Sequence, residues 1–338
     1  MKPAETATAI AGVSAGAPHR TASAGADRQN AGQRAAGWAA GAVILVGLSV
    51  VPAFARNGYT LSVFTQAALY AAMAAGWDVL SGYTGRENFG YALFVGTGAY
   101  TAALLDARLH LPLPAGIAAA GGASVLAAAL AGVPALRLRG PYFALATLAA
   151  AGIMERFTLI LWPVTGGEDG IYEITPLSLS GTVTYEATLV FMAVVVLGLY
   201  TATRSPWGMV LRAIRASETA CEASGLNTTT YKIGALLLSA LTAGVAGGLY
   251  AHVQEHVGPA VYSVEFSVTV IIMAFVGGVG TIWGAAAGGF LLTLLGESLR
   301  SLGPYRLLLY SAILLPVIIA SPRGIVAPVL DWLKERQR

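Results

Sequence analysis

Two groups of residues have the types and spacing needed for chemistry. Residues 252–256 read HVQEH, which fits the H-x-x-E-H pattern in which two histidines bind zinc and the glutamate acts as base. Glu155 and Arg156 stand together deep in an apolar run, where charged side chains usually face a cavity or a partner. The sequence therefore offers a metallopeptidase motif and a charge pair through which protons or sodium could be coupled to transport.

The metallopeptidase reading has little support elsewhere in the chain. The remaining histidines are His19 and His110, far from the motif, so no third ligand is at hand. The single cysteine, Cys221, excludes an internal disulfide and a cysteine-based zinc site. No P-loop is present, and the glycines at 277–284 lack the strand–turn–helix context of a dinucleotide site. We expect no catalytic residue, metal or cofactor in this chain, and HVQEH reads better as a polar helix end.

The elements that position these residues are predicted to be membrane helices. The chain is 56% hydrophobic and 11% charged, contains 41 glycines, and has a mean hydropathy of +0.68. Only a helix bundle in a membrane tolerates so much apolar surface, and small residues let such helices approach closely. The prediction is an all-α polytopic protein with about ten spans, some short or broken. The apolar runs lie near 36–55, 60–81, 90–105, 112–133, 141–162, 187–203, 233–251, 266–276, 284–299 and 307–321.

Three parts are expected along the chain. Residues 1–35 are polar, without hydrophobic periodicity, and predict a disordered tail. The transmembrane domain is expected over 36–325, and a short tail over 326–338. Ala53-Phe54-Ala55 resembles a signal-peptidase site, but the leader is too long, so the first run is interpreted as an uncleaved span.

The basic residues predict the orientation. With the N-terminus inside, most Lys and Arg fall in cytoplasmic segments, and Arg56, Arg108, Arg300 and Arg306 are those on the other side. This positive-inside bias predicts that both termini and the loop 204–232 are cytoplasmic. The loop 163–186 has acidic residues and no basic one, and is predicted to face outward.

Two glycine-dense stretches interrupt the apolar runs. They read SGYTGRENFGYALFVGTGAY at 81–100 and VGGVGTIWGAAAGG at 276–289. Breaks at comparable places in two halves can mark discontinuous helices around a translocation path. Close packing between helices explains the same glycines equally well. Both interpretations stay open at this stage.

The cytoplasmic stretch 205–232, SPWGMVLRAIRASETACEASGLNTTTYK, predicts an amphipathic helix between spans. Its apolar face is formed by Trp207, Val210, Leu211 and Ile214 at helical spacing. A second face carries Arg215, Glu218 and Glu222. Gly225 is expected to end the helix, and Asn227 or Thr228 to cap the next one. Such a helix either docks on a partner or lies on lipid headgroups.

Several motifs together resemble LivM-like permease subunits of bacterial branched-chain amino-acid ABC importers. They span about residues 60–330 and are specific as a set. The stretches are GYTGRENFGYALFVGTGAYTAALL (82–105), LRLRGPYFALATLAAAGIMER (136–156), TGGEDGI (165–171), LRAIRASETACEASGLNTTTYKIGALLLSALTAGVAGGLYAH (211–252), MAFVGGVGTIWGAAAGG (273–289) and SPRGIVAP (321–328).

The resemblance implies an inner-membrane subunit with specific partners. These are a second, homologous permease, two ATP-binding subunits that hold ATP and magnesium, and an extracytoplasmic solute-binding protein for which the 163–186 loop is the first candidate contact. TACEASG (219–225) resembles the core of the coupling helix that docks on the ATPases. The implied coupling residues are Trp207, Leu211, Ile214, Arg215, Glu218, Glu222 and Gly225.

The translocation path is the second implication of the resemblance. Its candidates here are Asn88, Tyr91, Tyr142, Glu155 and Arg156. Tyr91 stands where the family often has histidine, and Glu87 where an apolar residue is usual, so the solute stays open between branched-chain amino acids, urea, short amides and aromatic acids. The alternative from another class is a secondary transporter driven by ions through Glu155 and Arg156.

Overall fold

The computed structural model describes residues 48–49, 52, 58–138 and 140–300. Both predicted tails, the predicted span 307–321 and most of the run 36–55 lie outside these residues. The chain divides into two compact units, 1–51 and 52–338, and the account below concerns the second.

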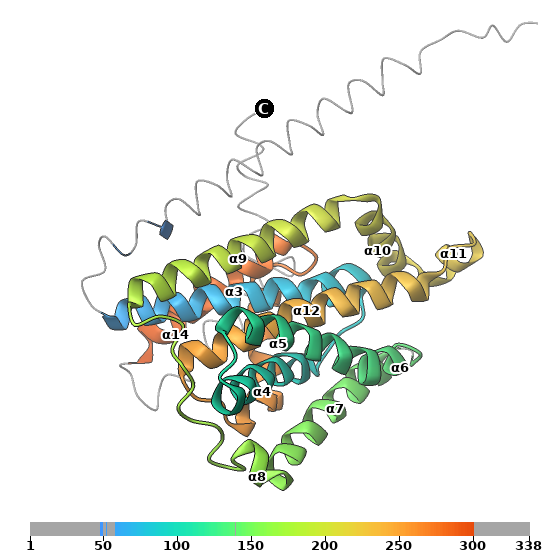
Figure 1. Cartoon of the computed structure of the whole chain (residues 1–338). Coiled ribbons are helices and arrows are strands. Elements are labelled where there is room, and N and C mark those ends of the chain that lie inside the picture. The colour runs from blue at the N-terminus through green and yellow to red at the C-terminus, as the bar shows by residue number, and fades with distance from the viewer. Residues whose placement is uncertain (1–47, 50–51, 53–57, 139, 301–338) are drawn as a thin grey trace, which may run out of the picture. The chain divides into compact units, whose positions relative to one another are not determined.

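Between residues 58 and 300 the regular elements are helices, as Figure 1 shows. The one strand-like feature in this part is an isolated antiparallel bridge between Ile171 and Val257. The all-α prediction is confirmed, and each predicted run from 60–81 to 284–299 coincides with a helix. The elements are α3 (Gly58–Thr84), α4 (Tyr91–Leu109), α5 (Leu113–Ala127), the π-helix η1 (Ala128–Gly132), α6 (Val133–Ala135), α7 (Pro141–Ile160), α8 (Trp162–Thr165), α9 (Gly181–Arg204), α10 (Pro206–Ala216), α11 (Glu218–Ala223), α12 (Thr228–Gln254), the 3₁₀-helix η2 (Pro259–Tyr262), α13 (Val264–Gly277) and α14 (Ile282–Ser298).

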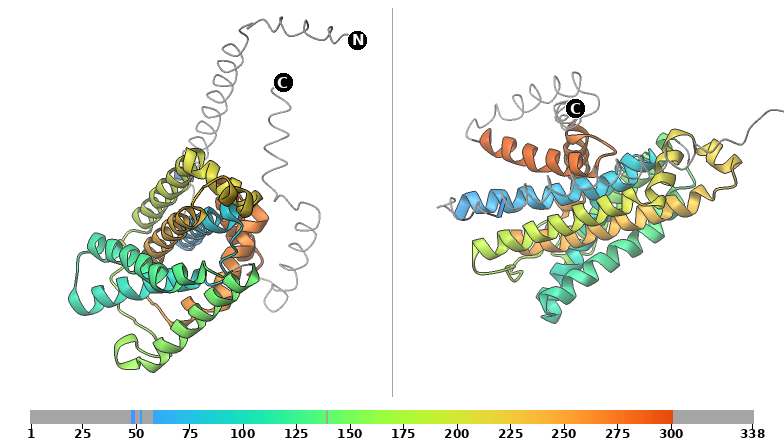
Figure 2. Two further views of the ribbon diagram at one scale, coloured as in Figure 1. Left: turned by 90° about the vertical axis from the view of Figure 1, so that its right-hand side faces the viewer. Right: turned by 90° about the horizontal axis from the view of Figure 1, so that it is seen from above.

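In the described part, four helices are long and apolar enough to cross a membrane. They are Leu113–Ala135, which joins α5 to α6, and α7, α9 and α12. Helices α3 and α4 are not among these four but are the most completely covered by their neighbours, and α3 contacts α9, α12, α13 and α14. The end view in Figure 2 shows α3 (blue) inside the other helices. A lipid-shielded central helix tolerates the polar residues that it carries.

Glycines bring α4 and α12 to backbone contact. A Cβ added at Gly98 would lie 2.6 Å from the Cα of Gly244, closer than any side chain permits. Membrane helices gain packing contacts from such approaches because lipid supplies no hydrophobic force between them. The packing interpretation of the first glycine-dense stretch is therefore correct for this part of it.

The same stretch also breaks the chain between α3 and α4. After Thr84 the backbone turns back, and the Nε1 of Trp77 donates to the carbonyl oxygen of Asn88 at 2.8 Å. Helix α4 thus begins about two turns inside the end of α3, given the rise of an α-helix. Its first amide groups are satisfied there, since Gly90 N donates to Asn88 Oδ1 at 3.0 Å and Ala92 N to Ser267 Oγ at 2.9 Å.

The second glycine-dense stretch separates α13 from α14, which meet at a bend of 117°. Gly278 and Gly280 have φ angles of 123° and 84°, which only glycine adopts without strain. Helix α14 runs antiparallel along α3, because Gly280 contacts Asp78 near one end of α3 and Glu297 contacts the Tyr59 hydroxyl at the other. The runs 266–276 and 284–299, which were predicted as short spans, are helices α13 and α14, and together they form a hairpin bent at the glycines.

Candidate functional site

The 205–232 segment forms two short helices rather than the single one predicted. Ser217 has an extended backbone and its Oγ accepts from Ala220 N at 3.3 Å, which ends α10 and caps α11. Gly225 then terminates α11 with a φ of 81°, donating to the carbonyl of Glu222 while Leu226 donates to that of Cys221. Asn227 caps α12 through Thr230 N. The expected roles of Gly225 and Asn227 are confirmed.

The predicted apolar face of this segment is packed against the chain itself. Leu211 and Ile214 are 0% and 3% exposed, and Trp207 is half-buried beside Gly234. Helix α10 contacts the adjoining ends of α3, α9 and α12. Leu211 and Ile214 therefore pack within the chain, because the periodicity reports burial without saying against what. The coupling role of Trp207, Leu211 and Ile214 stays a prediction.

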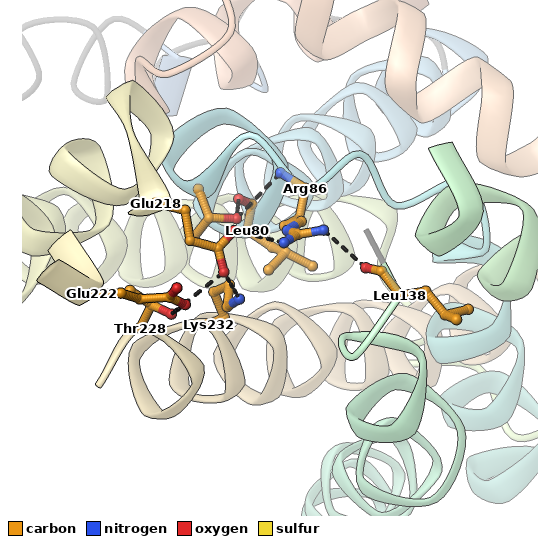
Figure 3. A network of polar contacts seen from close by, with 8 residues as sticks. Leu80, Arg86, Leu138, Glu218, Glu222, Thr228 and Lys232 are labelled. Carbon is orange, nitrogen blue, oxygen red and sulfur yellow. Dashed lines mark hydrogen bonds and ion pairs between the residues drawn. The ribbon is translucent and has the colours of Figure 1, made fainter. Parts of the chain in front are cut away.

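The charged face is also engaged within the chain, as Figure 3 shows. One carboxylate oxygen of Glu218 binds Arg86 Nη2 at 2.6 Å, and the other binds Lys232 Nζ. Arg86 also donates to the carbonyl of Leu138 at 2.9 Å. Glu222 accepts from the Thr228 hydroxyl at 3.0 Å. Glu218 thereby ties α11 to the segment after α3 and to the start of α12.

The protonation state of Glu218 keeps this network closed at neutral pH. Burial raises the pKa of the carboxyl, but the hydrogen bonds from Lys232 and Arg86 and their positive charges outweigh it and hold the pKa below its ordinary value. A lowered pKa means that the stabilisation is complete above the ordinary value and is lost as the pH falls through the lowered one. Glu218 is therefore charged, and its two ion pairs are present, throughout the physiological pH range.

Arginines fasten α10 to the end of α3. Arg215 Nη1 donates to the carbonyl of Gly82, and the Arg212 guanidinium lies 5.9 Å from the centre of the Tyr83 ring. Arg215 was predicted to contact a partner, and the structure instead gives it a contact inside the chain. Helices α10 and α11 thus lie at the same end of the bundle, at the right of Figure 1.

Part of the exposed surface of α10 and α11 is apolar. Met209 is 55% exposed, Ala213 and Ala216 follow it at helical spacing on α10, and Ala220 and Ala223 are exposed on α11. We call this surface the docking face, and it consists of Met209, Ala213, Ala216, Ala220 and Ala223. Arg212 and Glu222 flank it. Exposed apolar residues with charged neighbours are typical of a surface that contacts another protein.

The translocation-path candidates are not brought together. Asn88 and Tyr91 are buried among the central helices, where Asn88 caps the start of α4. The other candidates lie on α7, where Tyr142 and Arg156 are exposed and Glu155 is half-buried. Among the described residues, neither Glu155 nor Arg156 forms an ion pair. The path role of all of them stays a prediction.

The HVQEH histidines point to different partners. His252 is buried, and its Nδ1 lies 2.7 Å from the carbonyl oxygen of Thr175. His256 follows the end of α12, and its Nε2 lies 2.9 Å from the carbonyl of Asp169. Glu255 between them has a left-handed backbone, which breaks the helical spacing that a shared metal needs. These residues hold the loop after α8.

Sequence reasoning missed the partners of the charged face. Arg86 and Lys232 were noted as basic residues that set orientation, without their shared contact to Glu218. Asp78 was overlooked, although it is an acid inside the run 60–81 and the criterion that selected Glu155 would have found it. Asp78 lies on α3 and is completely buried.

Known proteins match most of the chain. The profile of the family described as branched-chain amino acid transport system / permease component matches residues 59–321. The high-affinity branched-chain amino acid transport system permease protein LivM of Salmonella typhimurium is 30% identical over 319 residues, covering 86% of this chain and 75% of that protein. The LivM of Escherichia coli is 29% identical over 321 residues, covering 86% and 76%. No solved structure matches.

Proposed function

The chain belongs to the family of branched-chain amino acid transport permeases, and we propose that it is one membrane-spanning subunit of an ATP-driven, binding-protein-dependent importer. The observation that carries the proposal is the match over residues 59–321, which includes the broken hairpin and the α10–α11 segment. The proposed cargo is a branched-chain amino acid, from the function named for both relatives. The family match supports this over the ion-coupled secondary transporter.

The proposed energy source lies in partner chains that bind ATP and magnesium. One ATPase subunit would contact the docking face, since its apolar residues are exposed and have charged residues beside them, as at a protein–protein contact. Nucleotide binding in the partner would shift the permease between two packed states with access from opposite sides. A second permease subunit and a solute-binding protein would complete the assembly.

Reconstitution tests this function. The chain is purified with the second permease and the ATPase subunits encoded beside it, placed in liposomes with ATP inside, and supplied with solute-loaded binding protein outside. We expect uptake of labelled leucine that requires ATP, competes with isoleucine and valine, and is insensitive to proton or sodium ionophores. Uptake by this chain alone, without ATP, would instead establish the secondary transporter.

The outward loop is a candidate contact for the binding protein. Glu168, Asp169 and Glu173 are exposed on it, and basic residues are absent from 163–186. The loop is firmly held, because Ile171 and Val257 exchange backbone hydrogen bonds of 2.9 and 3.0 Å. Asp106 Oδ2 also accepts from Thr175 N at 2.6 Å. A fixed acidic surface favours encounter with a basic partner surface.

The proposed orientation, with both termini and α10–α11 in the cytoplasm, predicts which cysteines an impermeant reagent reaches. Cys221 is buried and makes a poor reporter, so it is replaced by serine. In that background Leu179→Cys, at a 99% exposed outer position, should be labelled in cells with a permeabilised outer membrane. Thr229→Cys, at an exposed position in the first turn of α12 outside the docking face, should be labelled only after lysis. The reverse pattern would overturn the orientation.

A further inference from the structure

The two glycine-dense breaks of the chain meet at one point. Gly82, in the last turn of α3, lies against Gly280 in the bend between α13 and α14. A Cβ added to Gly82 would come within 2.6 Å of Gly280 N, and one added to Gly280 would be 3.3 Å from the Gly82 carbonyl oxygen. Residues far apart in sequence therefore leave no space between α3 and the bend.

Asp78 fixes the bend to α3 from within the core. Its side chain is completely buried, and Oδ1 accepts from Gly280 N at 2.7 Å. The glycine amide is available because the positive φ of Gly280 turns the backbone away from both helices. A polar side chain that is fully buried is costly unless it is hydrogen-bonded, which argues that the contact with Gly280 serves a purpose beyond packing.

Arg215 reaches the same point from α10. Its Nη1 donates to the Gly82 carbonyl and lies 2.7 Å from the position that a Cβ on Gly280 would take. Arg215 and Asp78 thus contact the two neighbouring glycines of the same junction, Gly82 and Gly280. The guanidinium thus closes over the contact that Asp78 makes inside the bundle.

We propose that Asp78 and Arg215 are positioning residues that transmit movement of α10 to the α13–α14 hairpin. The proposal rests on the proposed function, since α10 must be moved by an ATPase subunit. When α10 shifts, Arg215 leaves the Gly82 carbonyl and uncovers the bend, where the Asp78 hydrogen bond to Gly280 remains. The α13–α14 hairpin would be the moving element, because its two helices are joined at a glycine bend of 117°.

The test measures coupling in the reconstituted importer. Arg215→Gln keeps a donor but removes the charge, and Asp78→Asn keeps an acceptor of the same volume. The matched control is Arg204→Ala, which removes another arginine on the same side, one that stacks on the Tyr200 ring and does not reach the bend. ATP hydrolysis and solute uptake are measured in the same vesicles.

We expect both variants to assemble with the ATPases and hydrolyse ATP, while the ATP consumed per solute transported rises about tenfold, the range of a single coupling interaction. Arg215→Lys should restore part of the coupling, whereas Arg204→Ala should match the unaltered chain. A proportional fall in hydrolysis and uptake, or unchanged coupling, would overturn the proposal. If the Asp78→Asn variant fails to assemble, the Arg215→Gln variant alone tests the proposal, because Arg215 is exposed and its replacement should not disturb assembly. Failure of the proposed function itself would already appear as ATP-independent uptake by the unaltered complex.

Discussion

Replacing Leu211 by aspartate should prevent this subunit from folding into a stable bundle. Leu211 is 0% exposed and lies where α10 meets the ends of α3, α9 and α12. Burying an unpaired carboxylate there costs several kcal/mol, roughly the whole stability of many domains. The expected result is loss of the monodisperse subunit in detergent and of its cooperative thermal transition, even in the absence of any partner.

Met209→Asp is the matched control for that experiment. Met209 lies on the same helix, two residues earlier, and is 55% exposed. An acidic residue in the first turns of α10 also interacts favourably with the helix dipole. The Met209 variant should therefore keep the yield and melting temperature of the unaltered subunit. Equal stability of the Leu211 variant would show that α10 is not packed on the bundle as described.

The contrast between these neighbours shows what the sequence of α10 could predict. The spacing of Leu211 and Ile214 correctly gave one apolar face, because a helix places residues three and four apart on one side. The spacing cannot say whether that face meets the chain's own spans or another protein. The helix ends at Gly225 and Asn227 were predictable because caps depend on adjacent residues.

The charged contacts needed information that a local pattern does not contain. Glu218 binds Arg86, which is far away along the chain, and Asp78 binds the backbone of Gly280. Each pair is brought together because α3 packs against α12 and α14. Hydropathy does not specify which helices pack against one another. Composition and run length therefore predicted the helices well. They predicted the role of a site residue only where its neighbours in the sequence determine that role.

The hairpin α13–α14 shows the same limit for the span count. Both runs are apolar enough to be read as spans, but they have only 14 and 17 residues. At about 1.5 Å per residue neither crosses a 30 Å hydrocarbon layer comfortably. The positive φ angles of Gly278 and Gly280 bend the pair sharply. Length together with the glycines between them was the signal for a broken element.

The docking face carries the other large expected effect. Met209→Asp combined with Ala220→Glu leaves the folded subunit intact, since both positions are exposed. If an ATPase subunit covers this face, each substitution buries a charge in an apolar contact at a cost of several kcal/mol, which corresponds to binding weaker by about a hundredfold or more. The double variant should purify without its ATPases and lose ATP-dependent uptake.

Leu179→Asp is the control for this loss, because it adds the same charge at a 99% exposed position on the loop before α9, at the opposite end of the bundle. Its complex should retain the ATPases at the normal ratio. Co-purification of ATPases with the double variant at the normal ratio, together with normal uptake, would exclude the docking face as their contact. Retained ATPases with lost uptake would contradict it as well, because a surface that binds the partner must lose binding first. The two proposals therefore predict different results. The charge at Met209 should release the ATPases, whereas Arg215→Gln should impair coupling while the ATPases stay bound.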